Sequence, residues 1–272
     1  MNALMYHDLV AVGDEDSSGF PGRDAALYKI TPRMFDAHLN AISRSLTGDT
    51  AVPASPAFPA PPAPPAPPAL TFDDGGRSAM AAADMLEARR WSGHFFITTN
   101  YIGTYGFLTR NEIQELASRG HTIGAHSCSH PLRMAHCTWP QLVEEWSRSC
   151  STLSEIIGAP VTEASVPGGD FAPQVADAAA RTGITRLFTS EPTAHIRQLC
   201  GTTVAGRFTI QRWSSPATAA AIAAGDWLPC ARQALAWNAK KMTKRLGGAR
   251  YLRIRRLLLG QGNDVRWGDL DG

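Results

Sequence analysis

Two adjacent carboxylates, Asp73 and Asp74, follow the short apolar run 69–72 and precede two glycines. Their like charges repel each other unless a cation lies close by. One carboxylate can bind a divalent metal ion while the other stays free as a base for the metal-bound water, whose pKa falls toward about 7. Gly75 allows a tight turn of the backbone and leaves room for a substrate. A plain turn is the alternative, because Asp and Gly are both frequent in turns.

A second polar run, residues 124–131, carries His126 and His130 four positions apart. That spacing lets one helical turn or one compact loop direct both imidazoles at a single ion. Two histidines and one carboxylate form a catalytic zinc set that leaves a coordination position open for water. We therefore expect a divalent metal, with Zn²⁺ preferred and Co²⁺, Ni²⁺ or Mn²⁺ as alternatives.

The elements that must position these side chains alternate between strands and helices. Strands are expected over residues 3–6, 69–72, 94–98, 121–125, 161–166 and 185–189, and helices over 78–90, 110–119, 139–157 and 173–182. A further helix is expected to begin at Thr31-Pro32, and residues 216–224 and 228–259 also have helical patterns. Such alternation predicts a parallel sheet covered by helices, in which polar residues at the carboxyl ends of the strands form the site.

Several of these strands end on residues that can do chemistry. The first ends at His7-Asp8, the second at the two aspartates, the fourth at the two histidines, and the fifth at the run 167–170. Because the carboxyl ends of parallel strands meet at one edge of the sheet, this coincidence carries more weight than any single residue.

The run LTFDDGG, followed about fifty residues later by HSCSHP, resembles the polysaccharide deacetylase (NodB-homology) family of carbohydrate esterases. The first family motif is T-F-D-D-G and the second is H-[ST]-x-x-H, and both are present in the family order. The resemblance covers about residues 1–213. It implies an α/β fold, a distorted (β/α)7 TIM-like barrel of the NodB type. It also implies metal-dependent removal of acetyl groups from N-acetylated sugars of a polysaccharide or a lipid-linked glycan.

The resemblance also implies roles for individual residues. By motif position, Asp73 is similar to the catalytic base, and Asp74, His126 and His130 are similar to the metal ligands. Contacts with the substrate and its oxyanion are expected from Gly75 and from the loop after the fifth strand, which contains Pro167, Gly168 and Gly169. The partner expected is an acetylated carbohydrate.

The chain departs from the family pattern in its later motifs. The third motif, R-x-P-[YF]-G, corresponds to the run SVPGG, so Ser165 stands where the family has an arginine that orients the base. Arg33 and Arg207 are the two candidates to replace it, and the sequence does not choose between them. His195 and His7 are candidates for the general acid, although a core or surface histidine is the more usual outcome.

Two other functions stay open on these residues. The absent arginine favours a non-catalytic metal- or glycan-binding protein on the same fold, whereas the intact base beside a metal set argues against it. A hydrolase of another carbon–nitrogen amide, such as a formamide or a cyclic amide, would use the same metal chemistry.

Composition predicts one barrel-sized domain with a basic extension. The chain has 272 residues, of which 44% are hydrophobic. We assign residues 1–229 to the catalytic domain, with a Pro/Ala-rich insert at 53–68, and residues 230–272 to a helical extension. This extension holds ten Lys/Arg against three Asp. Its basic amphipathic stretch 240–259 is expected to contact an anionic membrane, with a solvated helix face as the alternative.

The remaining sequence features bear on location and partners. Five cysteines without a CxxC pair favour free thiols in a reducing compartment. The first residues do not resemble a signal peptide, and no window reaches the roughly 18 apolar residues of a membrane span. We expect a cytoplasmic protein, peripheral at the inner membrane face. The net charge of +2 gives no reason to expect nucleic acid.

Overall fold

The computed structural model describes residues 2–47 and 68–239. Residues 48–67 and 240–272 therefore lie outside the description, and with them all but the last residue of the 53–68 insert and the whole 240–259 stretch.

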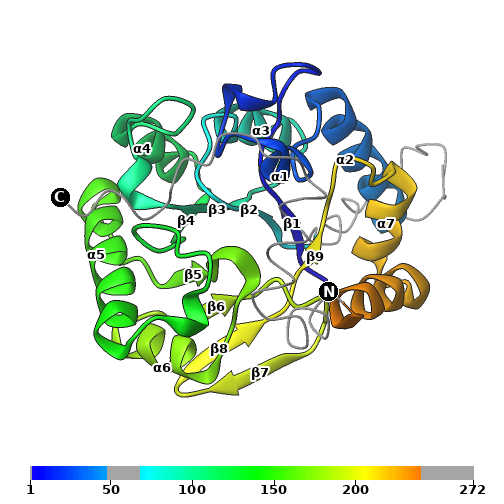
Figure 1. The fold of residues 1–272 in the computed structure, drawn as a ribbon. Coiled ribbons are helices and arrows are strands. Elements are labelled where there is room, and N and C mark those ends of the chain that lie inside the picture. The colour runs from blue at the N-terminus through cyan, green and yellow to red at the C-terminus, as the bar shows by residue number, and fades with distance from the viewer. Residues whose placement is uncertain (1, 48–67, 240–272) are drawn as a thin grey trace, which may run out of the picture.

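The described residues form one curled, mostly parallel sheet surrounded by helices, as Figure 1 shows. The strand order is β7-β8-β6-β5-β4-β3-β2-β1-β9, and only the β7–β8 pair is antiparallel. The strands are β1 (Leu4–Tyr6), β2 (Leu70–Phe72), β3 (His94–Ile97), β4 (Thr122–Ala125), β5 (Glu163–Ser165), β6 (Arg186–Phe188), β7 (Ile196–Leu199), β8 (Thr202–Ala205) and β9 (Phe208–Thr209). Within this described sheet, the outer strands β7 and β9 do not pair with each other. The expected α/β class and distorted barrel are confirmed.

The helices lie around the outside of the curled sheet (Figure 1). They are α1 (Arg23–Ala26), α2 (Pro32–Thr47), α3 (Ala79–Glu87), α4 (Arg110–Ser118), α5 (Trp139–Ile157), α6 (Pro173–Arg181) and α7 (Pro216–Ala224). Residues 227–239 are also helical. The expected helices are thus present in the described residues, with ends that differ by a few positions.

Burial on both sides explains why the central strands are mostly apolar and do not alternate between apolar and polar residues. Tyr6 stacks on Phe72 and Phe72 stacks on Phe95, with ring centroids 5.6 Å and 4.8 Å apart. Helix α2 covers this aromatic row with Phe35 and Leu39, which are fully buried and lie one helical turn apart. The core therefore holds β1, β2 and β3 side by side.

Register brings the chemically important residues to one edge. Tyr6 pairs with Phe72, and the backbone N–H of Asp73 donates to the carbonyl of Tyr6 at 3.1 Å. Ile97 of β3 likewise pairs with Ala125 at the end of β4. Residues that follow β1, β2 and β4 consequently emerge together at the carboxyl edge of the sheet.

Strands β7, β8 and β9 were not expected from the sequence. β7 is largely exposed and carries Arg197 and Gln198, and β9 has two residues, so neither has a clear apolar alternation. The described helix 227–239 is docked on β9, because Gln233 exchanges two hydrogen bonds with the backbone of Thr209 at 3.1 and 2.8 Å. The domain boundary at 229/230 stays a prediction.

Candidate metal centre and its neighbouring carboxylate

Asp74, His126 and His130 meet at the carboxyl ends of β2 and β4. One ligand atom from each lies within 4.8 Å of the other two. Oδ1 of Asp74 is 3.3 Å from Nε2 of His126 and 3.4 Å from Nε2 of His130. Burial would raise the pKa of Asp74, but hydrogen bonds from the two imidazoles hold it well below its usual value. The structure thus brings together the three residues expected as ligands, and they could hold a metal ion.

The donor set fits a divalent ion of the zinc type. Nδ1 of His126 lies 3.0 Å from the carbonyl oxygen of Ser165, which can accept only from a protonated Nδ1. That bond keeps a proton on Nδ1, so a metal ion that replaces the proton on Nε2 would find a neutral imidazole ligand, as in many histidine–metal sites. Two imidazole nitrogens and one carboxylate oxygen suit zinc and neighbouring transition metals.

The backbone around the cluster is held in conformations that side chains disfavour. Asp74, Ser127 and His130 have φ values of 75°, 63° and 60°. Each left-handed non-glycine residue costs about 1–2 kcal/mol, and such strain persists only when the surrounding structure enforces it. His126 and His130 therefore share a compact loop, one of the two arrangements that their spacing allowed.

Asp73 lies beside the cluster and is paired with Arg207. The guanidinium donates from Nη1 to Oδ1 at 2.6 Å and from Nη2 to Oδ2 at 2.7 Å. Asp73 is 4% exposed and Arg207 is fully buried. Burial would raise the pKa of Asp73, but the charges of Arg207 and His126 outweigh it and hold that pKa below its usual value. Asp73 is consequently an ionised carboxylate in a dry environment.

Arg207 is itself held from several sides. Its Nε donates to the carbonyl of Thr189 at 3.2 Å, and its Nη1 also donates to Oγ1 of Thr71 at 3.0 Å. The guanidinium lies over the rings of Phe96 and Phe188, 5.5 and 5.8 Å from their centroids. Arg207 comes from the link between β8 and β9, in the part of the sheet that sequence reasoning missed.

Of the two arginines considered from the sequence, Arg207 is the one in contact with Asp73. Arg33 is exposed near the start of α2, and the described residues show no contact between it and Asp73.

Ser165, which stands at the position of the family's arginine, makes two contacts of its own in the site. Its Oγ donates to Oδ1 of Asp73 at 3.1 Å and accepts from Nδ1 of His126 at 2.5 Å. One hydroxyl therefore links the candidate base to a candidate metal ligand.

The two candidates for the general acid occupy different environments. His7 follows β1 and lies near the cluster, because a charge on its ring contributes to lowering the pKa values of both Asp73 and Asp74. Its Nδ1 is buried without a hydrogen-bond partner among the described residues, and its ring packs on Tyr28 at 4.9 Å. His195 is exposed next to β7. No described contact joins it to the cluster.

The expected substrate-contacting residues line turns at the same edge. Gly75 has a φ of 86° and lies against Ile97, so a side chain there would be both strained and crowded. Pro167 opens a short 3₁₀ turn with Gly168 and Gly169, whose φ values are 61° and 68°. A Cβ on Gly169 would approach Oγ of Ser190 within 2.1 Å. Their contact with substrate stays a prediction.

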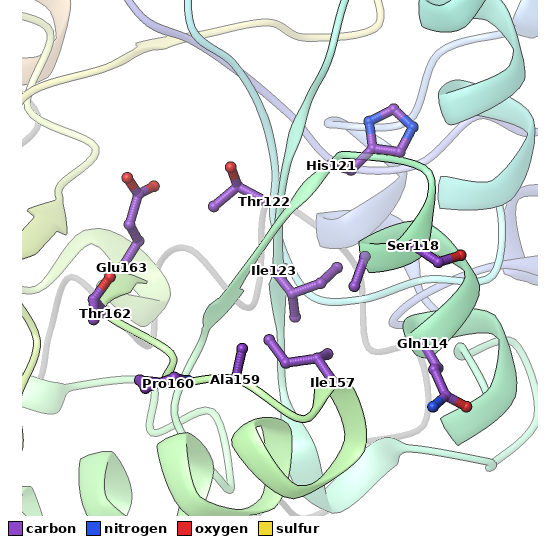
Figure 2. Close-up of a pocket in the computed structure, with 11 residues that line it drawn as sticks. Gln114, Ser118, His121, Thr122, Ile123, Ile157, Ala159, Pro160, Thr162 and Glu163 are labelled. Carbon is purple, nitrogen blue, oxygen red and sulfur yellow. The ribbon is translucent and has the colours of Figure 1, made fainter.

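A separate cavity of about 460 Å³ lies near the amino ends of β4 and β5, opposite the candidate metal centre. Figure 2 shows His121, Thr122 and Glu163 among the residues around it. The titratable side chains among them are engaged within the protein, since His121 binds Glu87 at 2.8 Å and Glu163 binds His94 at 2.8 Å. This cavity has no part in the arrangement described above.

The fold and the cluster together define an α/β-barrel protein with a candidate two-histidine, one-carboxylate metal centre. Residues 61–187 match the family model described as polysaccharide deacetylase. That stretch, just under half of the chain, is therefore similar to the polysaccharide deacetylase family. No curated protein matches the sequence.

Solved structures share the fold at low sequence identity. The Streptococcus pyogenes deacetylase PplD in complex with acetate is 18% identical, with 79% of this chain and 94% of that chain covered and a TM-score of 0.59. BA0330 from Bacillus anthracis is 19% identical, with coverages of 82% and 68% and a TM-score of 0.63. IcaB from Ammonifex degensii is 19% identical, with coverages of 80% and 95% and a TM-score of 0.59.

Proposed function

We propose that this chain is a metal-dependent carbohydrate deacetylase that hydrolyses the N-acetyl groups of a polysaccharide or a lipid-linked glycan. The observation that carries the proposal is that two neighbouring carboxylates have different partners. Asp74 lies with His126 and His130, whereas Asp73 is kept ionised by Arg207. A site that only binds a ligand has no need of a buried, charged base held beside a metal-binding cluster.

Each residue then has a defined task. A divalent ion held by Asp74, His126 and His130 would polarise the acetamide carbonyl and acidify a water molecule. Asp73 takes the proton from the attacking water while Arg207 keeps the carboxylate in place. The water oxygen adds to the carbonyl carbon, and the carbon–nitrogen bond then breaks as the amine nitrogen takes up a proton, which gives acetate and a free amine on the sugar.

Protonation of the leaving amine needs a second group. His7 is better supported for this step than His195, because it lies near both aspartates and has a buried ring nitrogen without a described partner. The loop 167–169 and Gly75 are proposed to contact the acetyl group and the sugar. Zn²⁺ is the proposed ion, with Co²⁺, Ni²⁺ and Mn²⁺ as alternatives.

The alternatives are separated by experiment. The absent motif-three arginine favoured a non-catalytic protein, and the Arg207–Asp73 pair removes that argument. Purified protein should release acetate from N-acetylated glucosamine oligomers. Asp73→Asn should bind metal normally but lose about 10²–10⁴-fold in turnover, as expected when a general base is removed. If only a formamide or a cyclic amide is hydrolysed, the amide alternative replaces deacetylation; equal turnover by Asp73→Asn would refute the assigned base.

We also propose a cytoplasmic location, peripheral at the inner face of the membrane through residues 240–259. All five cysteines are free thiols. The described helix 227–239 exposes Trp227 and Leu235, 76% and 70% accessible, directly before the basic stretch. Among the described residues, no helix is long and apolar enough to cross a membrane.

Vesicle binding tests this location. The full chain should sediment with vesicles that contain anionic lipid and not with neutral ones. Replacement of Lys240, Lys241, Lys244 and Arg245 by Gln should abolish the difference. Unchanged sedimentation of that variant would count against the basic stretch as the membrane contact.

A further inference from the structure

Glu145 of α5 holds the loop that connects the two histidine ligands. Its Oε2 accepts from the backbone N–H groups of Cys128 and Ser129 at 2.8 and 2.9 Å. Its Oε1 accepts from the hydroxyl of Ser129 at 2.6 Å. One carboxylate on a long helix thus receives three hydrogen bonds from two consecutive loop residues. Bonds to an ionised acceptor are the stronger kind in proteins.

The loop needs such an anchor because its backbone is not in a regular structure. Ser127 and His130, at its two ends, both have the left-handed φ values given above. Oγ of Ser127 accepts from the N–H of His130 at 3.0 Å, which closes the loop locally. That bond leaves the N–H groups of Cys128 and Ser129 without an acceptor inside the loop, and Glu145 supplies it.

The opposite side of the loop is also fixed. The carbonyls of Ser127 and Cys128 accept from the N–H groups of Thr99 and Asn100 at 3.2 and 3.0 Å. The ring of Phe20 packs on that of His130 with centroids 4.8 Å apart. With Glu145 in place, the loop is held from the 3₁₀ turn Thr99–Tyr101 after β3, from α5 and from the ring of Phe20. Without Glu145, the α5 side would lose these three hydrogen bonds.

We infer that Glu145 is a positioning residue for the candidate metal centre, which sets the relative position of the His126 and His130 side chains before any ion binds. The inference rests on the proposed metal site. It adds a residue outside both sequence motifs, 15 positions beyond the second histidine along the chain. Glu145 acts through the loop and touches neither the substrate nor the three ligand atoms.

A matched pair of variants tests this inference. Glu145→Ala removes all three hydrogen bonds, whereas Glu144→Ala removes an adjacent carboxylate that is 63% exposed and pairs only with Arg148 in the described ion pairs. Alanine keeps the helix in both. Calorimetric titration with Co²⁺ should show about 10–100-fold weaker binding for Glu145→Ala, the range seen for supporting residues around metal ligands. Glu144→Ala should bind within about twofold of the unchanged protein.

A second measurement needs no metal. Amide hydrogen exchange of Cys128 and Ser129 in the metal-free protein should be faster in Glu145→Ala and unchanged in Glu144→Ala. If Glu145→Ala does not fold, Glu145→Gln and Ser129→Ala, which remove the charge or one of the three bonds, should each weaken Co²⁺ binding by a smaller factor.

The outcomes separate the two proposals. If the unchanged protein does not bind Co²⁺, the metal site itself is wrong and the proposed function fails with it. If the unchanged protein binds Co²⁺ and a folded Glu145→Ala variant binds it equally well, with unchanged exchange at Cys128 and Ser129, only the positioning role of Glu145 is overturned.

Discussion

Replacing Arg207 by Gln should move the acid limb of the pH–rate profile to higher pH. Asp73 and Arg207 are both almost fully buried and share two hydrogen bonds of 2.6 and 2.7 Å. Two unit charges about 4 Å apart interact by about 4 kcal/mol at the effective dielectric constant of such sites. Since one pKa unit corresponds to 1.36 kcal/mol, that interaction is equivalent to about three units. Water entering the vacated space will screen part of it, so we expect a shift of about one to three units.

The sign follows from what holds the carboxylate ionised. In the unchanged protein, burial raises the pKa of Asp73 and the charges of Arg207 and His126 lower it further than burial raises it. Without the guanidinium the burial effect prevails, and a larger fraction of Asp73 is protonated at neutral pH. Activity should therefore fall at neutral pH and partly recover as the pH rises. A protonated carboxyl cannot take a proton from water.

The same substitution should lower stability. Asp73 has a folded-state pKa below its unfolded value, so its contribution to stability is present above the unfolded pKa and is lost as pH falls through the folded one. Breaking a buried ion pair by removing one partner costs about 3–5 kcal/mol. We expect the free energy of unfolding of Arg207→Gln at pH 7 to fall by about that amount, with the loss becoming smaller at pH 4.

The assay is kcat/KM for acetate release between pH 5 and 9, measured with metal in excess. Arg33→Gln is the matched control, because it removes the other arginine that could have served and leaves Asp73 untouched. The reasoning is refuted if Arg207→Gln folds, loses activity, and keeps its acid limb within about 0.3 pH units of the unchanged protein. Should Arg207→Gln be too unstable to purify, Arg207→Lys keeps the charge and loses the two-pronged contact, and should show the smaller shift.

Three further predictions concern the neighbours of Asp73. His7→Gln should lower kcat by about 10²–10⁴-fold with unchanged Co²⁺ affinity, and His195→Gln should stay within about twofold; the reverse result would move the general acid to His195. Ser165→Ala should lower kcat/KM about fivefold, equivalent to about 1 kcal/mol, since it removes one hydroxyl that bridges Asp73 and His126 while Arg207 remains. No change in kcat/KM would show that this bridge is dispensable. Removing the metal with a chelator should lower Tm by about 5–10 °C, compared with protein in which the metal concentration is a hundredfold above its Kd. This shift is calculated for a ligand that binds only the folded chain. An unchanged Tm in scanning calorimetry would exclude a bound ion.

The fold and the central cluster could be predicted because they depend on local patterns. The strands β2 and β4 are short, buried and mostly apolar. Asp73 and Asp74 follow directly after β2, and His126 follows directly after β4. The register of neighbouring parallel strands then brings these ends together without any information from distant parts of the chain.

The support of the site could not be predicted in the same way. Arg207 contacts Asp73 across 134 positions of sequence, from the link between β8 and β9, two strands that were not expected from the sequence. Glu145 lies on a helix that was predicted, but nothing in the sequence of that helix indicates which of its polar residues faces the histidine loop. Both contacts depend on how the sheet curls and how α5 docks, which are properties of the packed chain.

The loss of the motif-three arginine and the presence of Arg207 are best understood together. Ser165 belongs to β5, and Arg207 follows β8, which is separated from β5 by β6 alone. Both side chains contact the same oxygen, Oδ1 of Asp73, at 3.1 and 2.6 Å. A second guanidinium at position 165 would add an unpaired positive charge to a buried carboxylate that already has its full bidentate partner, and burial of such a charge is costly. A serine avoids that charge and supplies a small hydroxyl for which the space between Asp73 and His126 is sufficient. The sequence departure that first argued against catalysis is thus compatible with an oriented, ionised base, supplied with its guanidinium from another strand.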